Sequence, residues 1–138
     1  MLFPNAKYLT STIKVLGMIP IATGLLALLG VHDPIYHLPA KPDLVVLDSN
    51  LRFFGGVWFV LGLAIFASLK NISQPNPLFQ WILAACVLGG VGRLASMILF
   101  AVPPLPFIAF TVLEIVVLPY LMLWQKNVAA SVHLRYQE

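Results

Sequence analysis

The chain has 138 residues, of which 60% are hydrophobic and only 9% are charged, and its formal net charge is +3. A soluble domain carries about 25% charged residues, so this chain has too little polar surface to cover its exterior in water. The composition excludes an ordinary soluble domain and predicts a single integral membrane domain. No basic stripe interleaved with aromatic residues is present, so we expect no nucleic-acid partner.

Four apolar stretches are each long enough to cross a hydrocarbon core of roughly 30 Å. They are residues 13–31, 51–69, 78–101 and 106–124, and an outer loop, residues 32–50, joins the first two. Backbone polar groups in lipid must be satisfied within the segment, as they are in a helix. The other connections are short, which favours antiparallel neighbours. The sequence therefore predicts an all-α fold: an integral membrane four-helix up-down bundle.

Basic residues are unequally shared between the two ends of these spans. With four spans both termini lie on one side, and that side carries five basic residues, Lys7, Lys14, Lys70, Lys126 and Arg135. The opposite side carries two, Lys41 and Arg52. Because basic residues gather on the cytoplasmic side of membrane proteins, we expect both termini to be cytoplasmic.

Two charged residues lie inside the predicted spans. Arg93 is in the third and Glu114 is in the fourth, each about eight residues from the outer end and so about 12 Å deep at 1.5 Å per residue. An ionisable side chain in hydrocarbon costs roughly 2.5–3.5 kcal/mol on insertion scales, so it usually has a partner or a function. The sequence therefore predicts that this pair marks a site.

Further polar residues converge on the same outer half. Asp48 and Asn50 precede the second span, Arg52 begins it, and either Asp48 or Ser49 suits the N-cap of that helix.

Helical spacing places Gly55, Gly56 and Phe59 on the face of Arg52. A small-residue stripe, Ala85, Gly89, Gly92 and Ser96, runs beside Arg93. Few polar atoms on small or apolar surfaces are typical of a pocket for an apolar molecule with a polar head.

A structural interpretation stays open beside this one. Arg93 and Glu114 would then only lock two helices together, Arg52 would snorkel to the headgroups, and Asp48 would only cap a helix.

A divalent cation is a weaker alternative. Its ligands would come from the loop side chains His32, Asp33, His37, Asp43 and Asp48, or Asp48 would act with Glu114 to supply hard oxygen ligands. Their irregular spacing and the nearby arginines argue against it, and we expect no metal.

Motifs of catalysis are missing from the sequence. It has no Ser-His-Asp, His-Glu-x-x-His, Walker or dinucleotide pattern, and its one cysteine, Cys86, excludes a Cys-x-x-Cys motif. We therefore expect neither an enzyme nor a cofactor.

The run from Leu47 to Gly56, followed by Gly92-Arg93-Leu94 and Glu114, resembles the bacterial domain-of-unknown-function 4345 family. The resemblance covers nearly the whole chain. It implies a small multi-pass four-helix protein of the bacterial inner membrane and supplies no established reaction. The residues that match the family are Asp48, Asn50, Arg52, Arg93 and Glu114.

We expect the protein to bind a lipid or other amphipathic molecule with an anionic head, in an intramembrane pocket that opens outward, with a role in envelope or lipid homeostasis. The arginines would hold the head, the acids would orient the arginines, and the other polar groups would add hydrogen bonds. The predicted ligand-binding residues are Asp48, Asn50, Arg52, Arg93, Ser96 and Glu114. Membrane lipids, a hydrophobic or amphipathic small molecule, and a second copy or a membrane partner protein are the expected partners.

Two other functions stay open. In one, the chain is a subunit of a small proton-coupled transporter that uses Glu114 as the protonatable group and Arg93 as its switching partner. In the other, it is a purely structural accessory membrane protein whose charged pair fixes the bundle.

Overall fold

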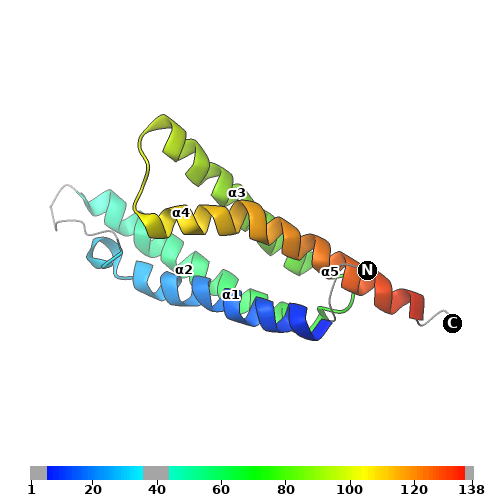
Figure 1. The fold of residues 1–138 in the computed structure, drawn as a ribbon. Coiled ribbons are helices and arrows are strands. Elements are labelled where there is room, and N and C mark those ends of the chain that lie inside the picture. The colour runs from blue at the N-terminus through cyan, green and yellow to red at the C-terminus, as the bar shows by residue number, and fades with distance from the viewer. Residues whose placement is uncertain (1–5, 36–43, 136–138) are drawn as a thin grey trace. The chain divides into compact units, whose positions relative to one another are not determined.

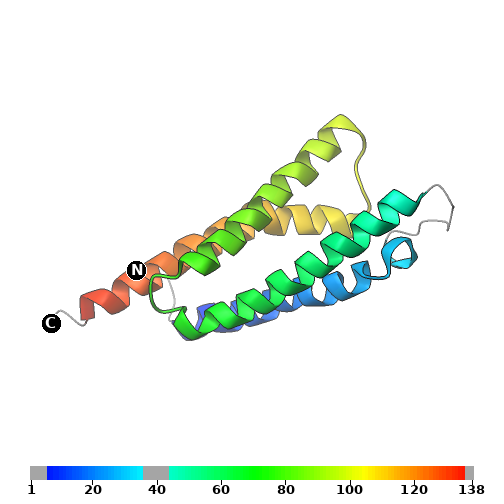
Figure 2. The same ribbon diagram turned by 180° about the vertical axis from the view of Figure 1, so that it is seen from behind.

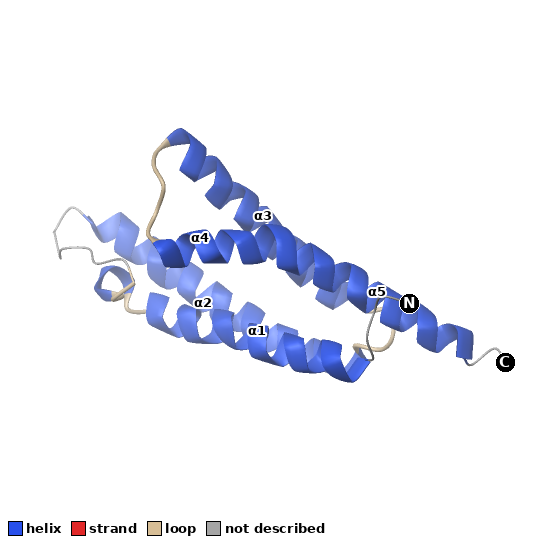
Figure 3. Cartoon of the chain, viewed as in Figure 1, coloured by secondary structure: helices blue, strands red, loops and turns tan. Residues whose placement is uncertain are grey.

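A computed structural model describes residues 6–35 and 44–135, which form helices joined by short connections (Figure 1). The first three long helices are α1 (Ala6–Ala27), α2 (Val45–Ser68) and α3 (Pro77–Leu99). The fourth is a continuous run of α4 (Leu105–Val112), the π-helical turn η4 (Leu113–Val117) and α5 (Leu118–Arg135). Short 3-10 turns, η1 (Gly30–His32) and η3 (Leu69–Asn71), follow α1 and α2. Figure 3 shows helices and loops and no strand in the described ranges, which confirms the predicted all-α class.

Four stretches are long and apolar enough to cross a membrane: Ala6–Ala27, Val45–Asn71, Pro77–Leu99 and Leu105–Val132. The prediction of a four-helix membrane protein is confirmed. The cytoplasmic placement of both termini stays a prediction, because helix length and composition do not fix orientation.

The helices extend beyond the predicted spans at several ends, because the prediction ended each span where the sequence becomes polar. The fourth helix continues to Arg135 rather than ending near residue 124, because residues 125–135 contain no proline or glycine to interrupt it. Likewise α1 begins at Ala6, and it ends at Ala27 before Gly30 takes the left-handed φ of 65°.

The chain divides into two compact units. One, the hairpin unit, comprises Ser11–Ala67 and holds most of α1 and nearly all of α2. The other, the C-terminal unit, comprises Met1–Thr10 with Ser68–Glu138 and holds α3, α4, η4 and α5. The single domain expected from the sequence stays a prediction.

Glycines bring α1 and α2 together within the hairpin unit, where the two helices lie side by side (Figure 1). A Cβ at Gly24 would lie 2.6 Å from the backbone nitrogen of Phe59, and one at Gly55 would lie 2.8 Å from the carbonyl carbon of Ala27. Small residues allow such close approach between membrane helices. The face of α2 that carries Gly55 therefore packs on α1.

Glutamines fasten the C-terminal unit at the end near η3. Gln125, only 1% exposed, donates from Nε2 to the backbone oxygens of Ile72 (3.2 Å) and Gln74 (2.7 Å). Its Oε1 accepts a hydrogen bond from Gln80 Nε2 at 2.8 Å. At the start of α3, Asn76 accepts from the amide of Phe79 and so provides the N-cap. These contacts join the start of α3 and the segment before it to α5.

Candidate functional site

The two intramembrane charges of the C-terminal unit meet between α3 and η4. Arg93 Nε lies 3.1 Å from Glu114 Oε2, which confirms that the pair predicted from equal depth comes together. The Glu114 side chain is 5% exposed, whereas that of Arg93 is 39% exposed. The carboxylate is therefore the buried, fixed member of the pair and the guanidinium is the accessible one.

A π-helical turn carries Glu114. In it the amide of Leu118 donates to the carbonyl of Leu113, five positions back. The next residue is Pro119, which has no N–H and whose ring would collide with the carbonyl of Ile115 in a regular α-helix. The wider turn relieves that collision. Single π turns inside α-helices are frequently found at functional sites.

Gly90 allows α3 to approach the π turn. A Cβ at this position would lie 2.7 Å from Glu114 Cβ and 3.1 Å from Ile115 Cδ1. A Cβ at Gly89 or at Gly92 would meet nothing within 4 Å. The close contact therefore uses Gly90, which was not part of the predicted small-residue stripe.

Two phenyl rings lie beside the guanidinium of Arg93. Its Cζ lies 5.9 Å from the ring centroid of Phe107 and 6.0 Å from that of Phe110, and the two rings stand edge to face, 6.3 Å apart. Each ring adds a cation–π attraction to the ion pair. Together with Glu114 they hold the guanidinium in one place.

The two terminal nitrogens of Arg93 have no hydrogen-bond acceptor in the part of the chain that the structure describes. Its Nε is paired with Glu114, and neither Nη1 nor Nη2 donates a hydrogen bond to any residue in the described ranges. Toward the Phe100–Pro104 connection, α3 and α4 diverge, as both views show (Figures 1 and 2).

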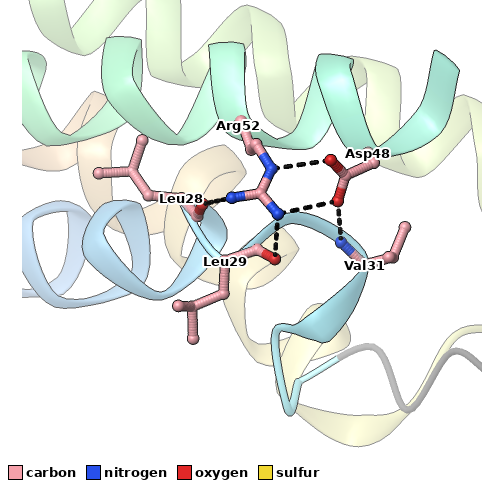
Figure 4. A network of polar contacts seen from close by, with 5 residues as sticks. All are labelled: Leu28, Leu29, Val31, Asp48 and Arg52. Carbon is pink, nitrogen blue, oxygen red and sulfur yellow. Dashed lines mark hydrogen bonds and ion pairs between the residues drawn. The ribbon is translucent and has the colours of Figure 1, made fainter. Parts of the chain in front are cut away.

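The hairpin unit contains a second arginine–carboxylate pair with a different environment (Figure 4). Arg52 Nε donates to Asp48 Oδ2 at 2.7 Å, and its Nη2 donates to Asp48 Oδ1 at 3.2 Å. Nη1 also donates to the carbonyl of Leu28 at 2.7 Å, and Nη2 to that of Leu29 at 3.1 Å. The amide of Val31 donates to Asp48 Oδ1 at 2.9 Å. Every nitrogen of this guanidinium is therefore bonded within the hairpin.

These bonds cap the end of α1. The last carbonyls of a helix have no partner inside it, and here Arg52 reaches from α2 to two carbonyls that follow α1. Gly30 fits under the carboxylate because a Cβ there would collide with Asp48. Asp48 lies inside the first turn of α2, which begins at Val45, so its predicted role as N-cap of that helix is wrong. Three unforeseen α-helical residues before Asp48 move it from the cap into the helix.

The remaining predicted residues have less defined roles. Asn50 and Ser96 are both exposed, and the backbone carbonyl of Ser96 accepts from the amide of Phe100 at 3.0 Å. The structure thus joins Asp48 with Arg52 and Arg93 with Glu114, each pair inside its own unit. One site made of all six residues stays a prediction.

No group of three potential metal ligands of the His, Cys, Asp and Glu types gathers in residues 6–35 and 44–135. His37 and Asp43, two residues of the metal alternative, lie outside the described residues.

Two residues of the candidate site, Phe107 and Gly90, were not predicted from the sequence. Phe107 precedes Glu114 by two helical turns and so shares its face, a spacing that would have identified it. Gly90 sits among neighbouring glycines, and no spacing rule distinguishes it from Gly89 or Gly92 before the partner helix is placed.

A protein-family model described as a domain of unknown function, DUF4345, matches residues 8–125. No curated protein and no solved structure matches the chain.

Proposed function

The chain belongs to the DUF4345 family, and we propose that it is a membrane protein that binds the anionic head of a lipid or similar amphiphile at Arg93. The membrane is the bacterial inner membrane, and the biological role is in envelope or lipid homeostasis. The proposed activity is binding and not catalysis.

One observation carries the proposal: among the described residues, none accepts a hydrogen bond from either terminal nitrogen of the Arg93 guanidinium, which its neighbours hold in place. Glu114 pairs with Nε, and the rings of Phe107 and Phe110 lie about 6 Å from the guanidinium carbon. A guanidinium with two open terminal nitrogens matches two oxygens of a carboxylate or phosphate. An unsatisfied donor is costly in hydrocarbon, so a ligand that supplies acceptors stabilises the site.

Each neighbour has a distinct role. Glu114 positions Arg93 from the buried side, and Gly90 lets the helices approach closely enough for that contact. The phenyl rings of Phe107 and Phe110 offer apolar surface beside the charge, which suits the part of an amphiphile next to its head.

Arg93→Lys is the most direct test because it keeps the charge that Glu114 needs but removes the two terminal nitrogens. The detergent-solubilised protein is exchanged against oleate, dioleoyl phosphatidylglycerol or dioleoyl phosphatidylethanolamine, and retained molecules are counted by native mass spectrometry. Losing charge-assisted hydrogen bonds worth roughly 1.5–3 kcal/mol should weaken retention of the bound amphiphile about tenfold or more.

The matched control is Lys70→Gln, which removes an exposed cation from η3. It should retain the amphiphile as the parent does. If Arg93→Lys is folded, as judged by its elution and melting temperature, and retains every probe equally well, the binding proposal is wrong.

A further inference from the structure

Charges in the C-terminal unit are balanced around Arg93 before any ligand binds. Arg93 is the one charged residue of α3, and Glu114 is the one charged residue of Leu105–Val117. Their ion pair leaves this stretch without net charge. The Asp48–Arg52 pair of the hairpin unit is likewise neutral.

An added anion disturbs that balance. A head with one negative charge leaves the neighbourhood of Arg93 with one uncompensated negative charge, and a phosphomonoester leaves up to two. Uncompensated charge in an apolar medium is expensive, and its solvation cost grows steeply with the charge. A head that brings its own cation keeps the whole assembly neutral.

The aromatic groups at the site suit such a cation. Phe107 and Phe110 stand edge to face beside the guanidinium, and aromatic faces attract ammonium groups as well as guanidinium groups. A phosphate bound to the terminal nitrogens of Arg93 would bring an ammonium group on the same head close to these rings.

We propose, resting on the binding function above, that the ligand is a zwitterionic phospholipid: a phosphodiester whose head also carries an ammonium group. Its phosphate oxygens accept hydrogen bonds from Nη1 and Nη2 of Arg93. Its ammonium group lies beside the rings of Phe107 and Phe110 and offsets the added negative charge. Phosphatidylethanolamine and phosphatidylcholine share this chemistry, whereas phosphatidylglycerol and phosphatidic acid lack the cation.

Competition between matched lipids tests the charge argument. The solubilised full chain is exchanged against an equimolar mixture of the four dioleoyl lipids just named, and retained species are quantified by native mass spectrometry. We expect the better retained of the two zwitterionic lipids to exceed phosphatidylglycerol at least threefold in the parent. In the double variant Arg93→Gln with Glu114→Gln, which is also neutral, that preference should disappear.

The other outcomes separate this inference from the proposed function. If the parent retains phosphatidylglycerol or phosphatidic acid as well as or better than the zwitterionic lipids, and the double variant loses this retention, the ligand is not a zwitterionic phospholipid. Anion binding at Arg93 would then still hold. Retention that does not differ between the parent and the double variant overturns both. A zwitterionic preference that persists in the double variant also overturns the inference, because Arg93 would then have no part in it.

Discussion

The two arginine–carboxylate pairs of this chain have the same composition and different environments. Arg52 in the hairpin unit bonds to Asp48 and to two backbone carbonyls, so its donors are used by the fold. Arg93 in the C-terminal unit is held through Nε by Glu114, and its terminal nitrogens make no hydrogen bond within residues 6–35 and 44–135.

The carboxylates of the two pairs also differ in their exposure and in their hydrogen-bond partners. Asp48 is 28% exposed at the side chain and also accepts from the amide of Val31, whereas Glu114 is 5% exposed. Glu114 Oε2 makes no hydrogen bond of standard geometry with the described residues. A charged pair in a membrane protein is therefore not by itself a sign of function. The distinguishing property is whether donors remain after the fold has been satisfied.

The largest loss of stability is expected when Arg93 is replaced and its buried partner Glu114 is kept. Arg93→Gln leaves the Glu114 carboxylate buried without its cation and should lower the free energy of unfolding by about 3–5 kcal/mol. The double variant with Glu114→Gln removes both charges and should recover most of that loss. Denaturant or thermal unfolding in detergent measures both. Additive losses would mean that the two side chains do not interact.

A smaller loss is expected at the exposed pair of the hairpin unit. Arg52→Gln removes hydrogen bonds to the carbonyls of Leu28 and Leu29 and should lower the melting temperature, by less than Arg93→Gln does because Arg52 is exposed. Lipid retention should remain that of the parent. Amide hydrogen exchange should show faster exchange at Val31, because its acceptor Asp48 is no longer held by the arginine. Loss of lipid binding with unchanged stability would reverse the roles assigned to the two pairs.

A substitution at Gly90 has a matched control in the same substitution at Gly89, its neighbour in sequence. Gly90→Ala places a methyl group against Glu114 Cβ and should destabilise the protein by about 1–3 kcal/mol and weaken lipid retention. Gly89→Ala meets open space and should be neutral or slightly stabilising, since alanine favours a helix over glycine. Equal melting temperatures for the two variants would show that α3 does not approach η4 at Gly90.

The smallest effect is expected at Pro119. Pro119→Ala restores an amide and removes the ring, so the π turn at Leu113–Val117 can relax into a regular helix. Stability should change little or rise, while Glu114 rotates relative to Arg93 and lipid retention falls a few-fold. Retention equal to that of the parent would show that the π turn does not position the carboxylate.

The long helices and the Arg93–Glu114 contact could be predicted because both follow from the positions of residues along the chain. Runs of apolar residues define the spans, and equal distances from Pro103-Pro104 place the two charges at one depth. The ends of the helices were harder to predict, because the last helix continues to Arg135 through a polar stretch that contains no proline or glycine.

The role of Arg52 could not be derived from the sequence. Its acceptors, the carbonyls of Leu28 and Leu29, lie more than twenty positions away, and backbone oxygens leave no trace in side-chain patterns. The same limit applies to Gln125, whose amide bonds to the backbone of Ile72 and Gln74. Sequence identifies which groups need partners, and only the fold shows which of them already have one.

Arg93 has donors to offer a ligand, whereas those of Arg52 are bonded within the hairpin unit. Electron cryo-microscopy of the protein in a lipid nanodisc would show which arginine contacts lipid. We expect non-protein density with an oxygen about 3 Å from Nη1 or Nη2 of Arg93, and Arg52 still bonded to Leu28 and Leu29. A protein group on both terminal nitrogens of Arg93, or a lipid head on Arg52 in place of those carbonyls, would contradict this expectation.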